Sequence, residues 1–167
     1  MPIDVKLTKL VIVFFFISIL LLLKFYLNCR SRVINMKYSI INFSVHGDHN
    51  GKLVALEKNE DFPFEIKRVY YIWDTTYDAV RGKHAHKNLE QVIVCMKGSC
   101  DFILDDGSSK SIVHLDSPTY GLYIKNNIWR EFTNFSEDCV VMVLASEHYN
   151  PEDYIHDYDE FLKSVNK

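Results

Sequence analysis

Cysteine is scarce in this chain of 167 residues, and its spacing does not suit a metal or redox site. None of the four cysteines, Cys29, Cys95, Cys100 and Cys139, belongs to a Cys-x-x-Cys pair, the spacing found in many zinc sites and thioredoxin-like motifs. Three of them lie within or next to predicted strands, where cysteine usually packs as a small apolar residue. We therefore expect reduced cysteines, which is typical of a cytosolic domain.

Positive charge is scarce in most of the chain. The sequence holds 19 Lys+Arg and 22 Asp+Glu, of which residues 1–35 contain five and one. The remainder therefore carries 14 basic against 21 acidic residues, a formal charge of −7. Nucleic-acid binding depends on clustered Lys and Arg that neutralise phosphates. No nucleic-acid partner is expected.

Long hydrophobic runs are absent except for one. Leu10 to Leu23 read LVIVFFFISILLLL, with Ser18 as the single polar residue. At about 1.5 Å per residue, a helix over residues 10–27 would be roughly 27 Å long, enough to span a thin bilayer. More Lys and Arg follow the run than precede it, so the positive-inside rule keeps the following domain cytoplasmic.

Residues 1–35 have three interpretations. The first is a membrane anchor through residues 10–27. The second, a secretory signal peptide, is disfavoured because no small-residue cleavage site follows the apolar run. The third is that translation begins at Met36, so that the leader is not native. In each case residues 36–167 form the functional domain.

Residues 36–167 show no helical hydrophobic period until near the end, and short apolar segments alternate with turn residues. Asn50-Gly51 marks one such turn. In EIKRVYYIWD, Arg68 and Tyr70 are predicted to share one strand face. Strands are predicted in KLVALE, EIKRVYYIWD, EQVIVCMKG, DFILDDG, SIVHLDSP, YGLYIKNN and CVVMVLAS.

The last segment of the chain has a different pattern. Asn150 can cap a helix, and Pro151 suits the first helical position. Glu152 and Asp153 favour the positive start of a helix. A helix is therefore expected from about Pro151 to Val165. Together the patterns predict an all-β fold, a cupin-like antiparallel jelly roll with a short C-terminal helix, preceded by a hydrophobic N-terminal helix.

His84, His86 and Glu90 form an H-x-H-x3-E pattern. It resembles the first motif of the cupin superfamily, whose metal-binding members hold an ion with two histidines and a glutamate. The second cupin motif ends in H-x3-N, but here Arg130 stands four residues before Asn134. A guanidinium stays protonated and cannot coordinate a metal.

Three interpretations of the histidine pair remain. The two histidines and the glutamate could still bind a metal as a facial triad. Both histidines could instead be structural or surface residues. The arginine favours a third interpretation, in which the barrel mouth binds an anion and the histidines move protons. On this interpretation no metal is expected.

Four longer segments carry a resemblance to one family: PFEIKRVYYIWDT, RGKHAHKNLEQVIVCMKGSCDFILDDG, LDSPTYGLYI and CVVMVLASEHYNPEDYI. They make residues 36–167 similar to the sugar-nucleotide 3,4-ketoisomerases, small cupin-fold enzymes that act on dTDP-4-keto-6-deoxyglucose. The resemblance implies an isomerase that moves the ketone from carbon 4 to carbon 3 without a redox cofactor. It also implies a place in deoxysugar biosynthesis for surface polysaccharide. Residues 1–35 lie outside it.

The resemblance implies catalytic roles for three residues. His84 would take the proton from carbon 3, which the neighbouring carbonyl acidifies, and His86 would be its partner in proton transfer. Imidazoles titrate near neutrality, which suits both steps. The two side chains share a face if their segment is extended. Tyr70 would steady an oxyanion or donate a proton near the sugar, unless it is simply a packed barrel tyrosine.

Charged and polar residues near these positions are candidates for substrate binding. Arg81 and Arg68 would hold the diphosphate, because a guanidinium fork matches phosphate oxygens. Arg68 has a surface salt bridge as its alternative interpretation. Glu90 and Gln91 would contact sugar hydroxyls or the diphosphate, or orient the histidines.

Arg130 and Asn50 are expected near the face of carbon 4 that receives the proton. An arginine in the Trp-Arg-Glu context resembles the branch that forms gluco products, whereas Asn50 matches neither branch. A homodimer is expected, because jelly rolls of this size often pair through sheet edges. The alternatives are a dTDP-sugar 3,5-epimerase, a non-catalytic sugar-nucleotide-binding cupin and a metal-dependent oxygenase.

Overall fold

A computed structural model of the protein describes residues 38–57 and 64–166. The expectations for the leader, which are the membrane anchor, the N-terminal helix and the start at Met36, lie outside the described residues. Within the described ranges, no helix is long and apolar enough to cross a membrane.

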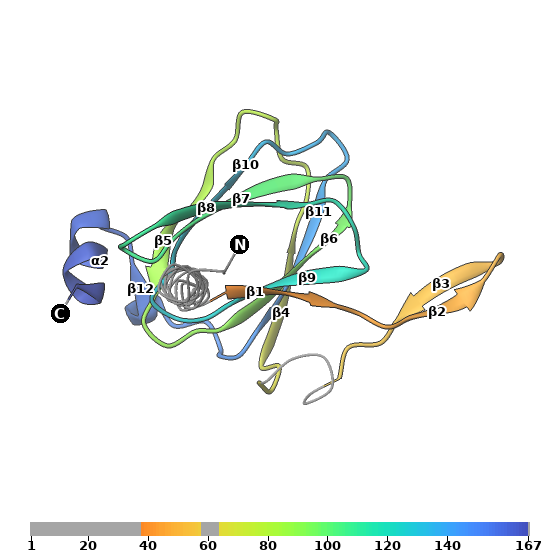
Figure 1. Ribbon diagram of the computed structural model, residues 1–167, viewed down its shortest axis with the longest axis horizontal. Coiled ribbons are helices and arrows are strands. Elements are labelled where there is room, and N and C mark those ends of the chain that lie inside the picture. Colours follow the sequence, from red (N-terminus) through yellow and green to blue (C-terminus); the bar gives the residue numbers. More distant parts are fainter. Residues whose placement is uncertain (1–37, 58–63, 167) are drawn as a thin grey trace, which may run out of the picture. The chain divides into compact units, whose positions relative to one another are not determined.

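Two five-stranded antiparallel sheets make up the fold, which confirms the predicted all-β, cupin-like architecture (Figure 1). The first sheet has the order β1-β9-β6-β11-β4 and the second β12-β5-β10-β7-β8. The strands of the first sheet are β1 (Tyr38–Asn42), β9 (Tyr120–Ile124), β6 (Gln91–Lys97), β11 (Val140–Ala145) and β4 (Arg68–Ile72). Those of the second are β12 (Tyr154–Ile155), β5 (Arg81–His86), β10 (Trp129–Thr133), β7 (Cys100–Asp105) and β8 (Lys110–Leu115).

Strand alternation determines which side chains enter the space between the sheets. In β6, Ile93 and Cys95 join the main core, whereas Val92 and Val94 join a second apolar cluster. From the other sheet, the main core receives residues of β7 such as Phe102, which is 2% exposed. Side chains of both sheets thus share one core, and it includes the three cysteines of the described chain, all free and buried: Cys95, Cys100 and Cys139.

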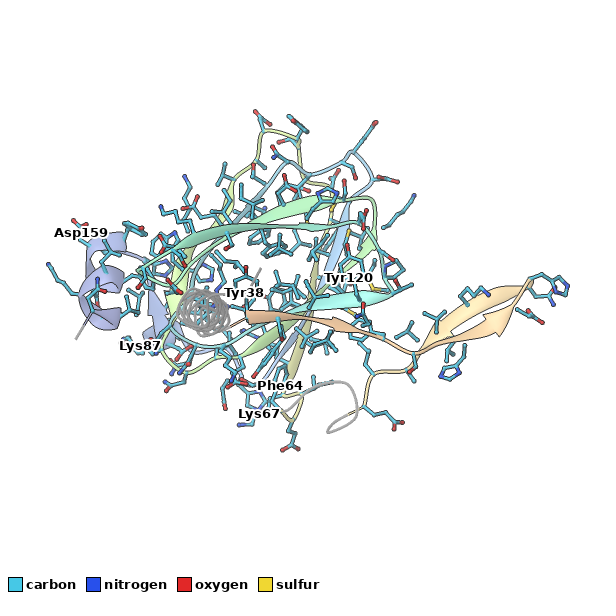
Figure 2. The ribbon with its side chains drawn as sticks, in the orientation of Figure 1. Tyr38, Phe64, Lys67, Lys87, Tyr120 and Asp159 are labelled. Carbon is cyan, nitrogen blue, oxygen red and sulfur yellow. The ribbon has the colours of Figure 1, made fainter. Side chains whose placement is uncertain are left out.

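A separate hairpin is formed by β2 (Val45–Asp48) and β3 (Gly51–Val54). The two strands pair with each other from Val45–Val54 to Asp48–Gly51, which places His49 and Asn50 in the turn. The hairpin extends beyond the edge of the two sheets, and its side chains are mostly exposed (Figures 1 and 2).

The C-terminal segment differs from the prediction, because the expected helix from Pro151 to Val165 is interrupted. Pro151–Asp153 form a 3-10 turn, capped as expected by Asn150, whose side chain accepts from the Glu152 amide. Tyr154 and Ile155 then pair with β5 as strand β12. Helix α2 spans Tyr158–Val165 only. Pairing with β5 keeps the middle of the segment extended, and the Asp157 side chain caps the helix by accepting from the Glu160 amide.

Candidate active site

A cavity of about 320 Å³ opens between the two sheets. Its lining comes from β4, β5, β6, β7, β10, β11 and β12, so both sheets contribute. Six of the residues proposed from the sequence lie on its wall: Arg68, Tyr70, Arg81, His84, Gln91 and Arg130. The cavity therefore gathers two arginines proposed for phosphate, a proposed base, a phenol and a further guanidinium in one space.

His84 lies on β5 with one ring nitrogen already occupied. Its Nδ1 is 2.9 Å from the carbonyl oxygen of Gly82. A carbonyl only accepts hydrogen bonds, so Nδ1 must carry the hydrogen and Nε2 is left unprotonated in the neutral ring. Burial, reinforced by the positive charge of Arg130, lowers the pKa of His84 to about 4. At neutral pH the ring is therefore an uncharged base.

A bulge in β5 places Arg81 and His84 on the same cavity, although they are three positions apart. Arg130 pairs with His84, but the next residue, Glu131, pairs with Gly82, so the register shifts by one residue. The two residues at the bulge, Gly82 and Lys83, have positive φ angles of 83° and 54°. A Cβ at position 82 would lie 2.7 Å from the Arg130 carbonyl oxygen, so this position requires glycine.

Arg130 is buried at 2% exposure and is held entirely by neutral groups. Its Nη1 donates to Gln91 Oε1, and its Nη2 donates to the carbonyl oxygens of Ile128 (3.1 Å) and Lys125 (3.3 Å). No carboxylate of the described residues is within ion-pair distance. Burial lowers the pKa of Arg130 to about 10, which still leaves the guanidinium charged at neutral pH. The cavity wall thus carries a positive charge with which no carboxylate of residues 38–57 or 64–166 forms an ion pair.

Gln91 connects this charge to Tyr70, because its Nε2 donates to the Tyr70 hydroxyl at 2.8 Å. The phenol therefore acts as an acceptor there, and its own proton remains available to a bound group. Burial is the main cause that raises the pKa of Tyr70 above its usual value, so the phenol is neutral. Arg68 lies over the Tyr70 ring at 5.2 Å, and its buried Nε has no hydrogen-bond partner in the described part of the chain.

His86 shares the strand face of His84, as expected for an extended segment, but it does not line the first cavity. The two rings meet edge to face with centroids 4.7 Å apart. His86 is 1% exposed and lies at a second cavity of about 480 Å³, which shares Arg68 and Tyr154 with the first. Burial, then the charge of Arg130, lowers the pKa of His86 to about 2.

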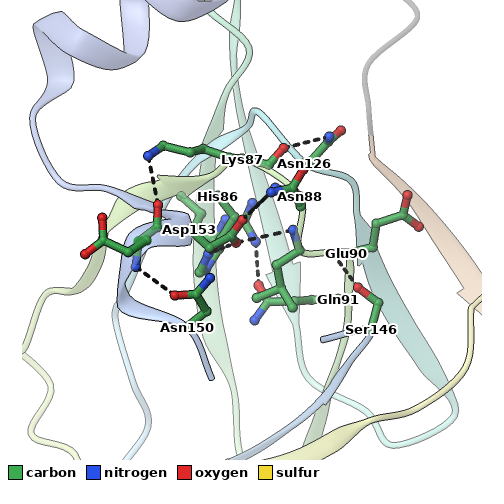
Figure 3. A network of polar contacts seen from close by, with 12 residues as sticks. His86, Lys87, Asn88, Glu90, Gln91, Asn126, Ser146, Asn150 and Asp153 are labelled. Atoms are coloured by element: carbon green, nitrogen blue, oxygen red, sulfur yellow. Dashed lines mark hydrogen bonds and ion pairs between the residues drawn. The ribbon is translucent and has the colours of Figure 1, made fainter. Parts of the chain in front are cut away.

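Two residues next to the histidines were missed by the sequence reasoning. The Tyr154 ring lies 4.9 Å from that of His84 and 4.3 Å from that of His86. The Asp153 carboxylate accepts a hydrogen bond from Nδ1 of His86 at 3.0 Å (Figure 3). Both residues belong to the segment EHYNPEDYI, whose resemblance to the family was the only available signal, and which was read as the start of a helix.

Two of the residues proposed from the sequence lie away from the cavity. The Glu90 carboxylate accepts from the Tyr123 hydroxyl at 2.5 Å, and Tyr123 belongs to the apolar cluster outside the main core. Asn50 lies in the exposed turn of the β2–β3 hairpin, where its amide and side chain contact Asp48. Across residues 38–57 and 64–166, no three or more His, Cys, Asp or Glu side chains are grouped as a metal site.

Comparison with known proteins identifies the family of this chain. Residues 36–166 match the family described as FdtA: WxcM-like, C-terminal. The chain belongs to this family. It is 53% identical over 132 residues to the TDP-4-oxo-6-deoxy-alpha-D-glucose-3,4-oxoisomerase of Aneurinibacillus thermoaerophilus, covering 79% of this chain and 95% of that enzyme. The resemblance stated from the sequence motifs is thus confirmed.

Solved structures of the family extend the comparison. A 3,4-ketoisomerase from Helicobacter canadensis is 52% identical, with a TM-score of 0.77 and coverage of 79% of this chain and 99% of that one. The 3,4-ketoisomerase QdtA from Thermoanaerobacterium thermosaccharolyticum, in complex with TDP, is 42% identical, with a TM-score of 0.76 and coverage of 78% and 95%. The two structures are of 3,4-ketoisomerases, the activity that the resemblance implied.

Proposed function

We propose that this chain is a 3,4-ketoisomerase that converts TDP-linked 4-keto-6-deoxyglucose into a 3-keto-6-deoxyhexose. One observation carries the proposal: a neutral His84, with Nε2 as its free basic nitrogen, lines the same cavity as the uncompensated charge of Arg130. A base and a cation in one cavity suit the removal of a proton to give an oxyanion. The activity of the relatives and the binding of TDP by QdtA support this reaction and this substrate.

The reaction moves two protons and needs no net oxidation. His84 Nε2 takes the proton at carbon 3, the electron pair of that bond enters the carbon 3–carbon 4 bond, and the carbonyl π pair of carbon 4 moves to its oxygen, which gives an enediolate. Arg130 and the Tyr70 hydroxyl would stabilise the charge on oxygen, a contribution of about 10²–10³ in rate for one such donor in other enzymes. The hydroxyl proton of carbon 3 passes to the oxygen at carbon 4, and a proton returned to carbon 4 completes the ketone at carbon 3 and the hydroxyl at carbon 4.

The diphosphate would lie at the rim, between Arg68 and Arg81. Arg68 offers its unpartnered Nε, and Arg81 lines the cavity from the bulge in β5. Two guanidinium groups on opposite sheets could clamp the diphosphate between them. Gln91 would contact the sugar, whereas Glu90 does not line the cavity and would not touch the substrate.

Arg130 would favour delivery of the proton to the face of carbon 4 that gives the gluco product. Asn50 lies away from the cavity of its own chain, so it can reach an active site only if its hairpin docks on a second copy of the chain. A role for Asn50 in substrate binding therefore requires a homodimer. Light scattering and an Asn50→Ala variant test it together: a monomer of full activity would contradict both.

A place in polysaccharide biosynthesis, a cytoplasmic location and attachment to a membrane through residues 10–27 rest on the sequence. Fractionation of cells that express the full chain tests the attachment. We expect the protein with the membranes, and recovery in the cytosolic fraction would contradict the anchor.

Turnover in heavy water tests the reaction itself. The full chain is incubated with TDP-4-keto-6-deoxyglucose, and the product is followed by NMR. We expect a carbonyl at carbon 3, deuterium at carbon 4 and a rate that a chelator does not change. Deuterium at carbons 3 and 5 with the ketone still at carbon 4 would indicate an epimerase. Absence of turnover would indicate a binding protein, and inhibition by chelator a metal enzyme.

A further inference from the structure

The buried carboxylate of Asp153 contacts His86 within the polar network of Figure 3. Asp153 is 9% exposed. Its Oδ2 accepts from His86 Nδ1 at 3.0 Å and from the Leu89 amide at 3.3 Å. Its Oδ1 accepts from the Asn88 amide at 2.9 Å and from Asn88 Nδ2 at 3.0 Å. Every partner is a hydrogen-bond donor, so both oxygens act as acceptors.

This arrangement determines the tautomer of His86. Because Oδ2 accepts, Nδ1 of His86 carries the hydrogen, and Nε2 is the unprotonated nitrogen. His84 is fixed in the same tautomer by the Gly82 carbonyl. The difference between the two rings lies in the partner, since His84 contacts a neutral carbonyl and His86 a carboxylate. The carboxylate therefore fixes the orientation of the His86 ring, while burial and the positive charge of Arg130 keep the pKa of His86 low and the ring neutral.

The position of His86 makes that difference useful. Its ring is edge-on to His84 at 4.7 Å and lies outside the cavity that holds His84, so His86 can act on the substrate only through its neighbour. A neutral His84 that has taken the proton from carbon 3 becomes a cation close to Arg130, which is unfavourable. Because burial keeps the pKa of His86 low, the neighbouring His86 ring stays neutral and adds no further positive charge beside the protonated His84.

We propose that Asp153 is a positioning residue that holds His86 in the Nδ1–H tautomer, so that an unprotonated Nε2 rather than an N–H group lies on the His86 ring beside the base His84. This inference rests on the proposed ketoisomerase function. It adds a residue 67 positions from His86 in the sequence, supplied by the 3-10 turn that replaces the start of the predicted helix.

The variant that tests the role is Asp153→Asn, which keeps the size and one acceptor oxygen. With that oxygen toward Asn88, the amide nitrogen faces His86 Nδ1 and forces the ring into the Nε2–H tautomer. We expect kcat to fall by about 10²-fold or more, while KM and the Kd for TDP change by less than about threefold. Asp153→Glu, which restores a carboxylate, should recover part of kcat.

The matched control is Asn88→Ala, which removes one hydrogen bond from Asp153 but leaves the contact with His86. A purely structural role of Asp153 predicts similar losses for both variants, whereas a positioning role predicts that the control keeps kcat within a few-fold of the original. A kcat for Asp153→Asn near that of the unmodified protein, or a matching loss in the control, would overturn the proposal.

A direct measurement does not depend on the variant folding. Long-range proton–nitrogen correlation spectra of the full chain distinguish the two neutral tautomers of each histidine. We expect His86 as the Nδ1–H form, and the Nε2–H form would overturn the proposal. Loss of the proposed function is separable, because a protein without turnover could still show the expected tautomer, whereas an active protein with the other tautomer refutes this inference alone.

Discussion

The same strands build two very different regions of the barrel. Along β6, Gln91 lies at the cavity with Arg130, whereas Cys95 lies in the main core with Cys100 and Cys139. In the cysteine region the polar atoms find partners within the chain: Cys95 Sγ contacts the carbonyl oxygens of Lys97 and Gly98, both at 3.2 Å. At the cavity, by contrast, the Arg130 guanidinium has no ion-pair partner and the Arg68 Nε has no hydrogen-bond partner among the described residues.

This difference separates stability from function. Charge buried without a counter-ion costs folding free energy, so Arg130 and the unpartnered Nε of Arg68 are poor choices for stability alone. They are suitable where a ligand completes the interactions, since an anionic substrate supplies the negative charge and the hydrogen-bond acceptors that these two arginines lack. We therefore expect substitutions at the cavity to change activity more than stability, and substitutions at the cysteines to do the opposite.

The largest effect is expected for His84→Asn. Asparagine keeps polarity but cannot accept the proton, so kcat should fall by about 10²–10⁴-fold. Affinity for TDP should change little, because Arg68 and Arg81 are left intact. The matched control is His114→Asn, since His114 pairs with Asp101 on the exposed side of β8, at 2.6 Å, away from the cavity. Turnover by His84→Asn near the rate of the control would refute the assignment of the base.

A smaller loss is expected for Arg130→Met, which removes the charge but keeps an apolar side chain of similar length. We expect kcat to fall by about 10²–10³-fold, as for loss of one oxyanion-stabilising donor. The unfolding temperature should hardly drop, because relief of the buried charge offsets the lost hydrogen bonds to the Ile128 and Lys125 carbonyls. A parallel collapse of stability and activity would mean that Arg130 is mainly structural.

The smallest effect on activity is expected in the cysteine region. Cys100 is completely buried, so Cys100→Ala leaves a small gap and should cost on the order of 1 kcal/mol of unfolding free energy. The kcat of the folded variant should stay within about twofold of the original. Denaturant unfolding and steady-state kinetics measure the two quantities, and a selective loss of kcat would break the separation between the two regions.

The strands with regular alternation could be predicted from the sequence, and those that shape the site could not. Residues 68–72 alternate as expected, with Arg68 and Tyr70 facing the cavity and Val69 and Tyr71 exposed, whereas Ile66 lies before the strand and is exposed. In β5 the bulge at Gly82 and Lys83 breaks the period of two. At the start of β6, Gln91 faces the cavity, whereas Glu90, which precedes the strand, contacts the Tyr123 hydroxyl instead.

The cavity residues were named from the family resemblance, whereas their contacts depend on tertiary structure. Asp153 lies far from His86 in the sequence, and its neighbours Asn150, Pro151 and Glu152 are typical of the start of a helix. Pairing of Tyr154 and Ile155 with β5 is a long-range interaction, which local propensity does not contain. The uncompensated state of Arg130 is likewise visible only once the surrounding carbonyls are in place.

The protonation state of His84 is the most direct test of the account. Its ring resonances can be identified by their loss in His84→Asn and then followed by NMR as the pH is lowered from about 7. Because burial lowers the pKa of His84 to about 4, the ring should stay neutral, in the Nδ1–H form, down to about pH 5 and gain a proton only below that. A ring that titrates near its ordinary pKa of about 6.5, or that carries its hydrogen on Nε2, would contradict a neutral base poised beside an unneutralised cation.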